Sequence, residues 1–324
     1  GESWEITDNQ SGISIVKNGK FAGKKINNLL KKYNKNILGS YYQNKKSFPL
    51  LIKFIDANQK LSVQVHPTDK FAEKHNEENG KTEMWYILAA KPGSKLVYGI
   101  DTKTNTEKLK KATKKGKLTP YLKEVEVKAG DFFFIPGGTV HAIEEGILLA
   151  EIQQNSDTTY RLYDWDRTDE NGKSRPLHID KAFKVINSLQ SKNTKPKKGE
   201  SISYENDNYK LKLLTASPYF TVEHITLKNK FDFNPDSKRF YVIINLKNTI
   251  NLSTEQKNYK LKAGETMLIP AALNKITIKG NGEFLRTYIH KDFKEFKTYM
   301  QKLNFSEDEI YKIPGINLFD KVNS

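Results

Sequence analysis

Residues 130–143, GDFFFIPGGTVHAI, carry an apolar run that ends at Pro136 and is followed by a glycine-rich turn and His141. Gly130 allows a tight turn before the apolar run, and Pro136 ends the strand that this run predicts. Gly138 lets the backbone fold back, so that the histidine after it turns inward. The stretch therefore predicts a turn, a buried strand and an inward-facing His141.

The same pattern of turn and strand returns 134 residues later in the chain. Residues 127–136 read VKAGDFFFIP and residues 261–270 read LKAGETMLIP, with seven of the ten positions alike in type or identity. This internal repeat indicates two related halves. The many short apolar runs between glycine and proline residues indicate that each half is a β-barrel or sandwich. Lys275 stands where the second half would carry the histidine, so we expect that half to hold no metal.

The rest of the chain is organised around these halves. We predict a catalytic domain with helical additions over residues 1–190 and a second, metal-free β domain over 203–290. Residues 191–202 (SKNTKPKKGESI) are polar and predict a linker. Residues 291–324 show helical spacing of apolar side chains and predict a helical C-terminal tail. Peripheral helices are also predicted at 24–33, 68–75, 106–115 and 179–189.

The amino-acid composition limits which metal ligands and which partners the chain can have. The chain of 324 residues has no cysteine, so His, Glu, Asp or Gln must hold any metal. It has no apolar run that resembles a signal peptide or a membrane span, so we expect a soluble, cytoplasmic protein without membrane partners. The net charge of +16 comes mainly from lysines scattered through polar loops. That scatter favours a solvated surface over a nucleic-acid interface, and it would attract an anionic substrate.

Four side chains with metal-binding donors lie at the edges of predicted strands. Gln64 and His66 are two residues apart in LSVQVHP, so a strand places both on one face. Glu83 begins another apolar strand, and His141 follows the glycine-rich turn. One Gln, one Glu and two His match the nitrogen and oxygen donors that zinc prefers, with an open position left for substrate. Spacing alone does not prove that they converge.

The arrangement of Gly130, Pro136, Gly138 and His141 resembles the second motif of the cupin family. Within the cupins, the chain is most similar to the type I mannose-6-phosphate isomerases. The similar stretches run in the expected order over roughly residues 1–290: GESWEI (1–6), LSVQVHP (61–67), KTEMWYIL (81–88), GDFFFIPGGTVHAI (130–143), LLAEIQQNSDTTYRLYDWDR (148–167) and RPLHIDKA (175–182). The family usually extends further before the GESWE segment.

This resemblance implies a mainly β fold of two cupin-like β-barrel or jelly-roll halves with a few peripheral helices. It implies an aldose–ketose isomerase that interconverts mannose 6-phosphate and fructose 6-phosphate with one Zn²⁺ per chain. The implied zinc ligands are Gln64, His66, Glu83 and His141. The implied catalytic residues are Lys81 and Arg161, and the implied substrate-binding residues are Ser62, Lys81 and Arg161. The expected partner is a small sugar phosphate, and the oligomeric state stays open.

The chemistry of these residues is coherent with such a reaction but leaves alternatives. An enediol intermediate develops negative charge on an oxygen, which zinc can stabilise and which Lys81 and Arg161 can screen. The sequence does not determine the general base. Glu151 and Asp157 are candidates, and a structural role fits either carboxylate at least as well. An iron-dependent cupin oxygenase is an alternative, which oxygen uptake would reveal. A non-catalytic sugar-binding cupin is a third, although the metal-binding pattern is intact.

Overall fold

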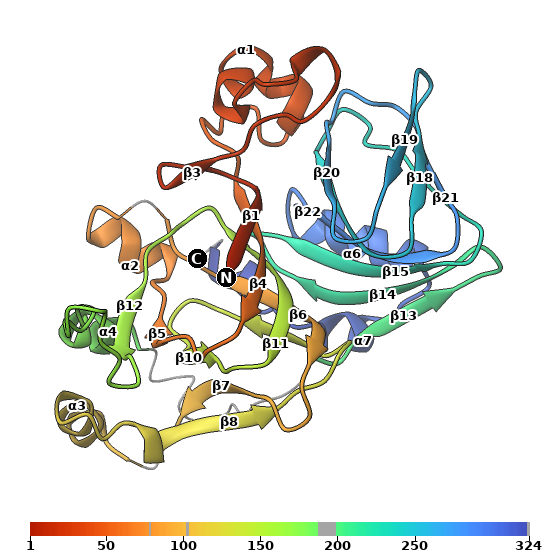
Figure 1. Ribbon diagram of the computed structural model, residues 1–324. Coiled ribbons are helices and arrows are strands. Elements are labelled where there is room, and N and C mark those ends of the chain that lie inside the picture. Colours follow the sequence, from red (N-terminus) through yellow and green to blue (C-terminus); the bar gives the residue numbers. More distant parts are fainter. Residues whose placement is uncertain (78, 102–103, 187–198, 323–324) are drawn as a thin grey trace. The chain divides into compact units, whose positions relative to one another are not determined.

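The structure is a computed structural model that describes residues 1–77, 79–101, 104–186 and 199–322. The described residues form two compact units, each built mainly from β-strands (Figure 1). The first unit comprises residues 1–4 and 52–186, and the second comprises 5–51 and 199–322. Among these residues, no helix is both long enough and apolar enough to cross a membrane. Most of the predicted linker, residues 191–198, lies outside the described residues.

Two five-stranded sheets make the barrel of the first unit, with strand orders β1-β4-β11-β6-β9 and β12-β5-β10-β7-β8. Trp85, Phe133 and Leu149 belong to the buried core of this barrel. The strands are β1 (Glu2–Ile6), β4 (Leu50–Ala57), β5 (Val63–Val65), β6 (Glu83–Ala90), β7 (Lys95–Ile100), β8 (Leu122–Glu126), β9 (Phe132–Ile135), β10 (His141–Ile143), β11 (Ile147–Gln154) and β12 (Tyr160–Tyr163).

The strand register of the first barrel sets where its polar side chains meet. Glu83, at the start of β6, pairs with Ile135 of β9 and with Gln153 of β11. His141, at the start of β10, pairs with Gln64 of β5. These pairings join distant parts of the chain, with Gln64 and His141 being 77 residues apart, which local sequence patterns cannot specify.

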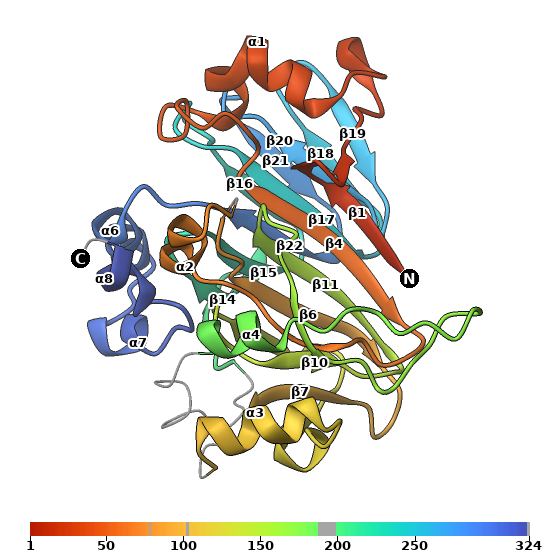
Figure 2. The ribbon, with the colours of Figure 1, turned by 90° about the vertical axis from the view of Figure 1, so that its left-hand side faces the viewer.

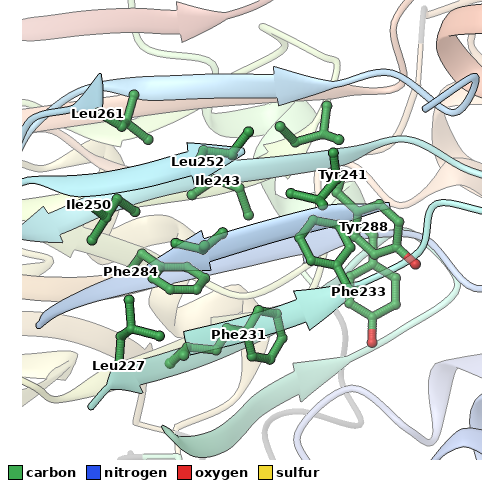
Figure 3. Packing of buried hydrophobic residues seen from close by; sticks show 14 residues of the cluster. Leu227, Phe231, Phe233, Tyr241, Ile243, Ile250, Leu252, Leu261, Phe284 and Tyr288 are labelled. Atoms are coloured by element: carbon green, nitrogen blue, oxygen red, sulfur yellow. The ribbon is translucent and has the colours of Figure 1, made fainter. Parts of the chain in front are cut away.

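The second unit repeats this architecture, with sheets of order β13-β14-β15-β22-β17-β20 and β16-β21-β18-β19. Its apolar core draws side chains from both sheets (Figure 3). The strands are β13 (Ile202–Glu205), β14 (Tyr209–Ala216), β15 (Thr221–Leu227), β16 (Lys230–Phe233), β17 (Tyr241–Lys247), β18 (Ile250–Ser253), β19 (Asn258–Leu261), β20 (Thr266–Ile269), β21 (Ile276–Lys279) and β22 (Gly282–Tyr288).

The repeated turn takes the same conformation in both barrels. Gly130 and Gly264 have φ angles of 87° and 80°, in the left-handed region that favours glycine. Each precedes a short strand, β9 in the first barrel and β20 in the second. The prediction of a mainly β fold with two related halves is therefore confirmed.

Residues 5–51 pack with the second unit, whereas the sequence predicts a first domain that runs unbroken from residue 1 to 190. The backbone explains this grouping, because the amides of Ser40 and Tyr41 donate to the carbonyls of Ser237 and Lys238. The ring of Phe48 also lies 4.8 Å from that of Phe240. The segment contains β2 (Asp8–Asn9), β3 (Gly12–Ile13), the 3-10 helix η1 (Gly19–Phe21) and α1 (Ile26–Leu38).

Helices lie around both barrels, as the sequence predicts. The first unit carries α2 (Asp69–Lys74), α3 (Thr106–Lys114), the 3-10 helix η2 (Thr119–Tyr121) and α4 (Ile179–Val185). The helix predicted at 179–189 is described only up to residue 186. The C-terminal helices α6 (Phe293–Lys302), α7 (Glu307–Tyr311) and α8 (Leu318–Val322) gather in one group (Figure 2). Phe296 and Met300 of α6 pack against Leu211 and Leu213 of β14.

The interior of the second barrel contains a buried ion pair. In the strand register of the second barrel, Arg286 of β22 lies opposite Ile243 of β17. In the first barrel, Glu151 of β11 lies opposite Trp85 of β6 in the corresponding strand pair, so Arg286 and Glu151 occupy equivalent positions. The Arg286 guanidinium lies 2.6 Å from the Glu223 carboxylate. Its central carbon lies between 4.8 and 5.4 Å from the ring centres of Phe231, Phe233, Tyr241 and Tyr288. The second barrel thus holds a cation supplied by its own chain.

We expect Arg286→Met to lower the free energy of unfolding by about 3–5 kcal/mol, because it leaves the buried Glu223 carboxylate without its cationic partner. Chemical denaturation measures this change. Lys230→Ala is the control, since it removes the exposed ion pair with Asp232 and should cost at most about 1 kcal/mol. A similar small loss in both variants would contradict a stabilising role for the buried pair.

Candidate active site

Three buried side chains converge at one end of the first barrel. His66 follows β5, Glu83 begins β6 and His141 begins β10. Their ligand atoms all lie within 4.8 Å of one another. The exposed fraction is 1% for the His66 side chain and 0% for that of Glu83. This His–Glu–His group could hold a metal ion.

The two imidazole rings have a defined orientation. Nδ1 of His66 lies 3.0 Å from the carbonyl oxygen of Thr158, and Nδ1 of His141 lies 2.9 Å from that of Thr139. A carbonyl only accepts hydrogen bonds, so each Nδ1 carries the hydrogen and donates it. In the neutral rings, each Nε2 therefore presents a lone pair. This arrangement orients metal-binding histidines in many proteins.

The lone pairs of both rings meet beside the Glu83 carboxylate. The two Nε2 atoms are 3.1 Å apart. Nε2 of His66 lies 3.4 Å from Oε2 of Glu83, and Nε2 of His141 lies 3.3 Å from Oε1 of the same carboxylate. Neither buried oxygen of Glu83 accepts a well-oriented hydrogen bond from the residues described. Two lone pairs and a carboxylate that face one point attract cations, and the Lys81 ammonium already lies 3.0 Å from Glu83. The nitrogen and oxygen donors of the group also fit a divalent metal ion.

Burial keeps the two imidazole rings in the neutral form that binds metal. Desolvation, with a smaller contribution from Lys81, lowers the pKa of His66 well below its ordinary value of 6.5. Desolvation and Lys81 likewise lower the pKa of His141 to about 4. Both rings are therefore neutral at pH 7. Burial also raises the pKa of Glu83 to about 7, against the opposing effect of the Lys81 ammonium.

Gln64 lies at the edge of this group. Its amide Nε2 is 3.5 Å from Nε2 of His141, and its Oε1 accepts a hydrogen bond of 3.4 Å from the Ser62 hydroxyl. A half-turn of the amide exchanges its oxygen and nitrogen and would present the oxygen to a metal. The structure therefore brings all four predicted metal ligands together.

A cavity of about 270 Å³ in the first unit lies next to the His–Glu–His group. Gln64 and Lys81 line the cavity and also contact that group. The predicted substrate-binding residues Ser62, Lys81 and Arg161 all line it. The charged side chains of the lining are Glu2, Lys53, Lys81, Glu151, Asp157, Arg161, Arg167 and Arg175. Five cations against three carboxylates make the cavity a suitable place for an anion.

Lys81 and Glu151 are two of the buried charged side chains that line the cavity. The Lys81 ammonium lies 2.9 Å from Nε2 of His66 and 3.0 Å from Glu83. Burial would lower its pKa, but Glu83 and Glu151 raise it, so the ammonium stays charged. Glu151 accepts a hydrogen bond of 2.8 Å from the Trp85 indole. Burial would raise the pKa of Glu151, but Lys81 and Lys53 hold it below its ordinary value.

The side chain of Arg161 lies on the cavity side of β12. Its neighbours Tyr160 and Leu162 are buried in an apolar cluster with Val63 and Val65, while Arg161 itself lines the cavity. Its Nη1 donates a hydrogen bond of 2.9 Å to the carbonyl of Pro176. Its Nε is buried and makes no hydrogen bond with the residues described.

Sequence reasoning did not single out four charged residues of the cavity. Lys53 lies in the apolar strand β4 with 5% of its surface exposed, and an isolated lysine in such a strand is a signal that could have been used. Glu2, Arg167 and Arg175 lie in stretches of polar or mixed sequence that offer no such signal. Their place in the cavity depends on how distant segments pack.

A double β-barrel whose first half encloses a buried His–Glu–His group beside a basic cavity defines a metal-binding cupin enzyme. Two family models match the chain: phosphomannose isomerase type I, catalytic domain, over residues 1–98, and mannose-6-phosphate isomerase, cupin domain, over residues 209–289. The chain belongs to the type I mannose-6-phosphate isomerase family and is therefore an isomerase.

Relatives of known name agree over most of their length. The chain is 35% identical over 293 residues to the mannose-6-phosphate isomerase of Streptococcus mutans, covering 89% of this chain and 88% of that protein. It is 36% identical over 293 residues to the mannose-6-phosphate isomerase ManA of Bacillus subtilis, covering 89% of each. The crystal structure of a Bacillus subtilis mannose 6-phosphate isomerase matches with a TM-score of 0.80 and 31% identity, over 89% of this chain and 90% of that one.

Proposed function

We propose that this chain interconverts mannose 6-phosphate and fructose 6-phosphate with one zinc ion held by Gln64, His66, Glu83 and His141. The observation that carries the proposal is the convergence of two Nε2 lone pairs and the Glu83 carboxylate next to a basic cavity. The names of the relatives support the choice of substrate. The cysteine-free donor set of nitrogen and oxygen atoms supports zinc.

The isomerisation moves a proton between C1 and C2 of the sugar and develops negative charge on a carbonyl oxygen. A bound zinc ion supplies Lewis-acid stabilisation of that charge. The Lys81 side chain stays protonated beside the His–Glu–His group, so its ammonium can donate a hydrogen bond to the oxygen that becomes charged. Arg161 offers a buried, unpartnered Nε–H, which suits an anionic group of the substrate.

The general base remains a choice between two carboxylates of the cavity lining, Glu151 and Asp157. The pKa of Glu151 is held below its ordinary value, so this side chain is ionised at neutral pH, as a base requires. Its hydrogen bond from the Trp85 indole fixes its position. These observations favour Glu151.

We also propose that the chain acts in the cytoplasm on a small sugar phosphate, without a nucleic-acid or membrane partner. The basic cavity is lined by side chains of one unit and has the chemistry of a site for a small anion. The lysine excess outside it is spread over polar loops, which supports a solvated surface.

Metal analysis combined with a coupled assay tests the proposal. Protein purified without added metal should contain close to one zinc per chain and should form fructose 6-phosphate from mannose 6-phosphate. The assay follows fructose 6-phosphate through a linked dehydrogenase reaction. Zinc-loaded protein that does not convert mannose 6-phosphate would overturn the proposed substrate. Oxygen uptake with iron in place of isomerisation would identify the oxygenase alternative.

A further inference from the structure

We infer that Asp164 is a positioning residue that orients Arg167 and Arg175 to bind the phosphate group of the substrate. This inference rests on the proposed function, because it names the part of the cavity that takes the phosphate. Asp164 is 5% exposed and directly follows β12, the strand that carries Arg161. It does not itself line the cavity, but both of its arginine partners do.

The Asp164 carboxylate bridges the two arginines. Its Oδ1 accepts from Nη2 of Arg167 and, at 2.6 Å, from Nη2 of Arg175. Its Oδ2 accepts from Nε of Arg175 at 2.8 Å, so the contact with Arg175 is bidentate. The hydrogen bonds from Arg175 and Arg167 outweigh burial and hold the pKa of Asp164 below its ordinary value. The carboxylate is therefore charged at neutral pH and fixes both guanidinium groups.

Each arginine keeps donors for a ligand. A guanidinium has five N–H groups. Arg175 uses Nε and one N–H of Nη2 on Asp164, and Arg167 uses Nη2 on the carboxylate and Nε on the Asp164 carbonyl. The side chains of Arg167 and Arg175 are 33% and 51% exposed, so the remaining donors are accessible from the cavity they line.

The charge of this group matches a phosphate. Arg161 lies near enough to Arg175 and Arg167 for their positive charges to act on it. Three guanidinium groups and one carboxylate leave a net charge of +2, against about −1.5 to −2 for a phosphate monoester at neutral pH. Without Asp164, the positive charges of the three arginines would repel one another, and Arg167 and Arg175 would lose the partner that orients both. The carboxylate therefore favours an ordered site that still carries a positive excess.

The alternative is that Asp164 only shapes the turn that follows it, where Trp165 and Asp166 have positive φ angles of 56° and 53°. Asp164→Asn distinguishes the two roles. We expect the KM for mannose 6-phosphate to rise about tenfold while kcat stays within about threefold, since two charge-assisted contacts are weakened. Inorganic phosphate, used as a competitive inhibitor, should bind more weakly by the same factor. Zinc content and Tm should not change.

Arg175→Ala is the second variant, because an exposed side chain can be removed without unfolding the barrel. It should reproduce the rise in KM. The double variant with Asp164→Asn should show little further rise, as expected for residues that act together. Lys173→Ala is the control, since this exposed cation is near in sequence but does not line the cavity. Unchanged KM and unchanged phosphate inhibition in both test variants would overturn the inference, as would a rise in KM equal to that of the control.

Calorimetric binding of inorganic phosphate separates this inference from the proposed function. If the parent protein does not isomerise mannose 6-phosphate, the proposed function fails. The phosphate site is then still tested, because Asp164→Asn should weaken phosphate binding about tenfold relative to the parent. If the parent isomerises the sugar and phosphate binding is unaffected by either variant, only the role of Asp164 is refuted.

Discussion

His141→Ala should remove the bound zinc and lower kcat/KM for mannose 6-phosphate by at least about a thousandfold. The His141 ring is buried, and its Nε2 lies 3.1 Å from that of His66 and 3.3 Å from Glu83, so the substitution removes one of the three central donors. A metal ion contributes several kcal/mol to the stabilisation of a developing charge, and about 4 kcal/mol corresponds to this factor. Metal analysis and the coupled assay measure both effects.

His75→Ala is the matched control for this experiment. His75 is an exposed histidine at the end of α2, and its Nδ1 bonds only within its own helix, to the carbonyl of Phe71. The control should keep its zinc and its activity. Circular dichroism should show that both variants retain their strands. Full zinc occupancy in His141→Ala would refute the proposed ligand set.

Arg161→Ala should leave folding and zinc content nearly intact and should lower kcat/KM by at least about a hundredfold. A charge-assisted contact in a site that excludes water contributes around 3 kcal/mol, which gives this factor. The buried and unpartnered Nε–H of Arg161 is the donor that a substrate anion would satisfy. Arg161→Lys should recover little activity, because an ammonium lacks the planar fork of a guanidinium. Steady-state kinetics on both variants test this.

The structural alternative for Arg161 is an ion pair with a carboxylate such as Asp157 or Asp164. Asp164 makes its close ion pairs with Arg167 and Arg175 instead, which weakens this alternative for Asp164. Lys173→Ala again serves as the control, because it removes a nearby charge from outside the cavity lining. If Arg161→Ala stays folded and turns over at nearly the parent rate, its assignment is wrong. If the variant unfolds, the side chain has a structural role instead.

Local sequence patterns were sufficient for the elements of the fold. The glycine turns at Gly130 and Gly264 and the apolar runs after them depend on backbone preference and burial, which a short stretch encodes. The grouping of residues 5–51 with the second unit was not predictable in this way. It depends on hydrogen bonds such as that from Ser40 to Ser237, between segments far apart in the chain.

The candidate site was predictable where one strand determines the geometry. Gln64 lies in β5 and His66 directly follows it, so the alternation of side chains places both toward one face. His66 belongs to the His–Glu–His group, and Gln64 lies at its edge. The cavity partners Lys53 and Arg175 were not predictable, because they enter from separate segments and meet only through tertiary packing. The resemblance to a known family supplied the predicted set of metal ligands, since no spacing rule joins Glu83 to His141.

The Arg286–Glu223 pair has a consequence for how the protein responds to a shortage of metal. The positive charge inside the second barrel is covalently attached, so the Glu223 carboxylate gains its counter-ion when β15 pairs with β22. We expect loss of the proposed zinc ion from the first barrel to leave this pair intact, because none of the proposed ligands belongs to it.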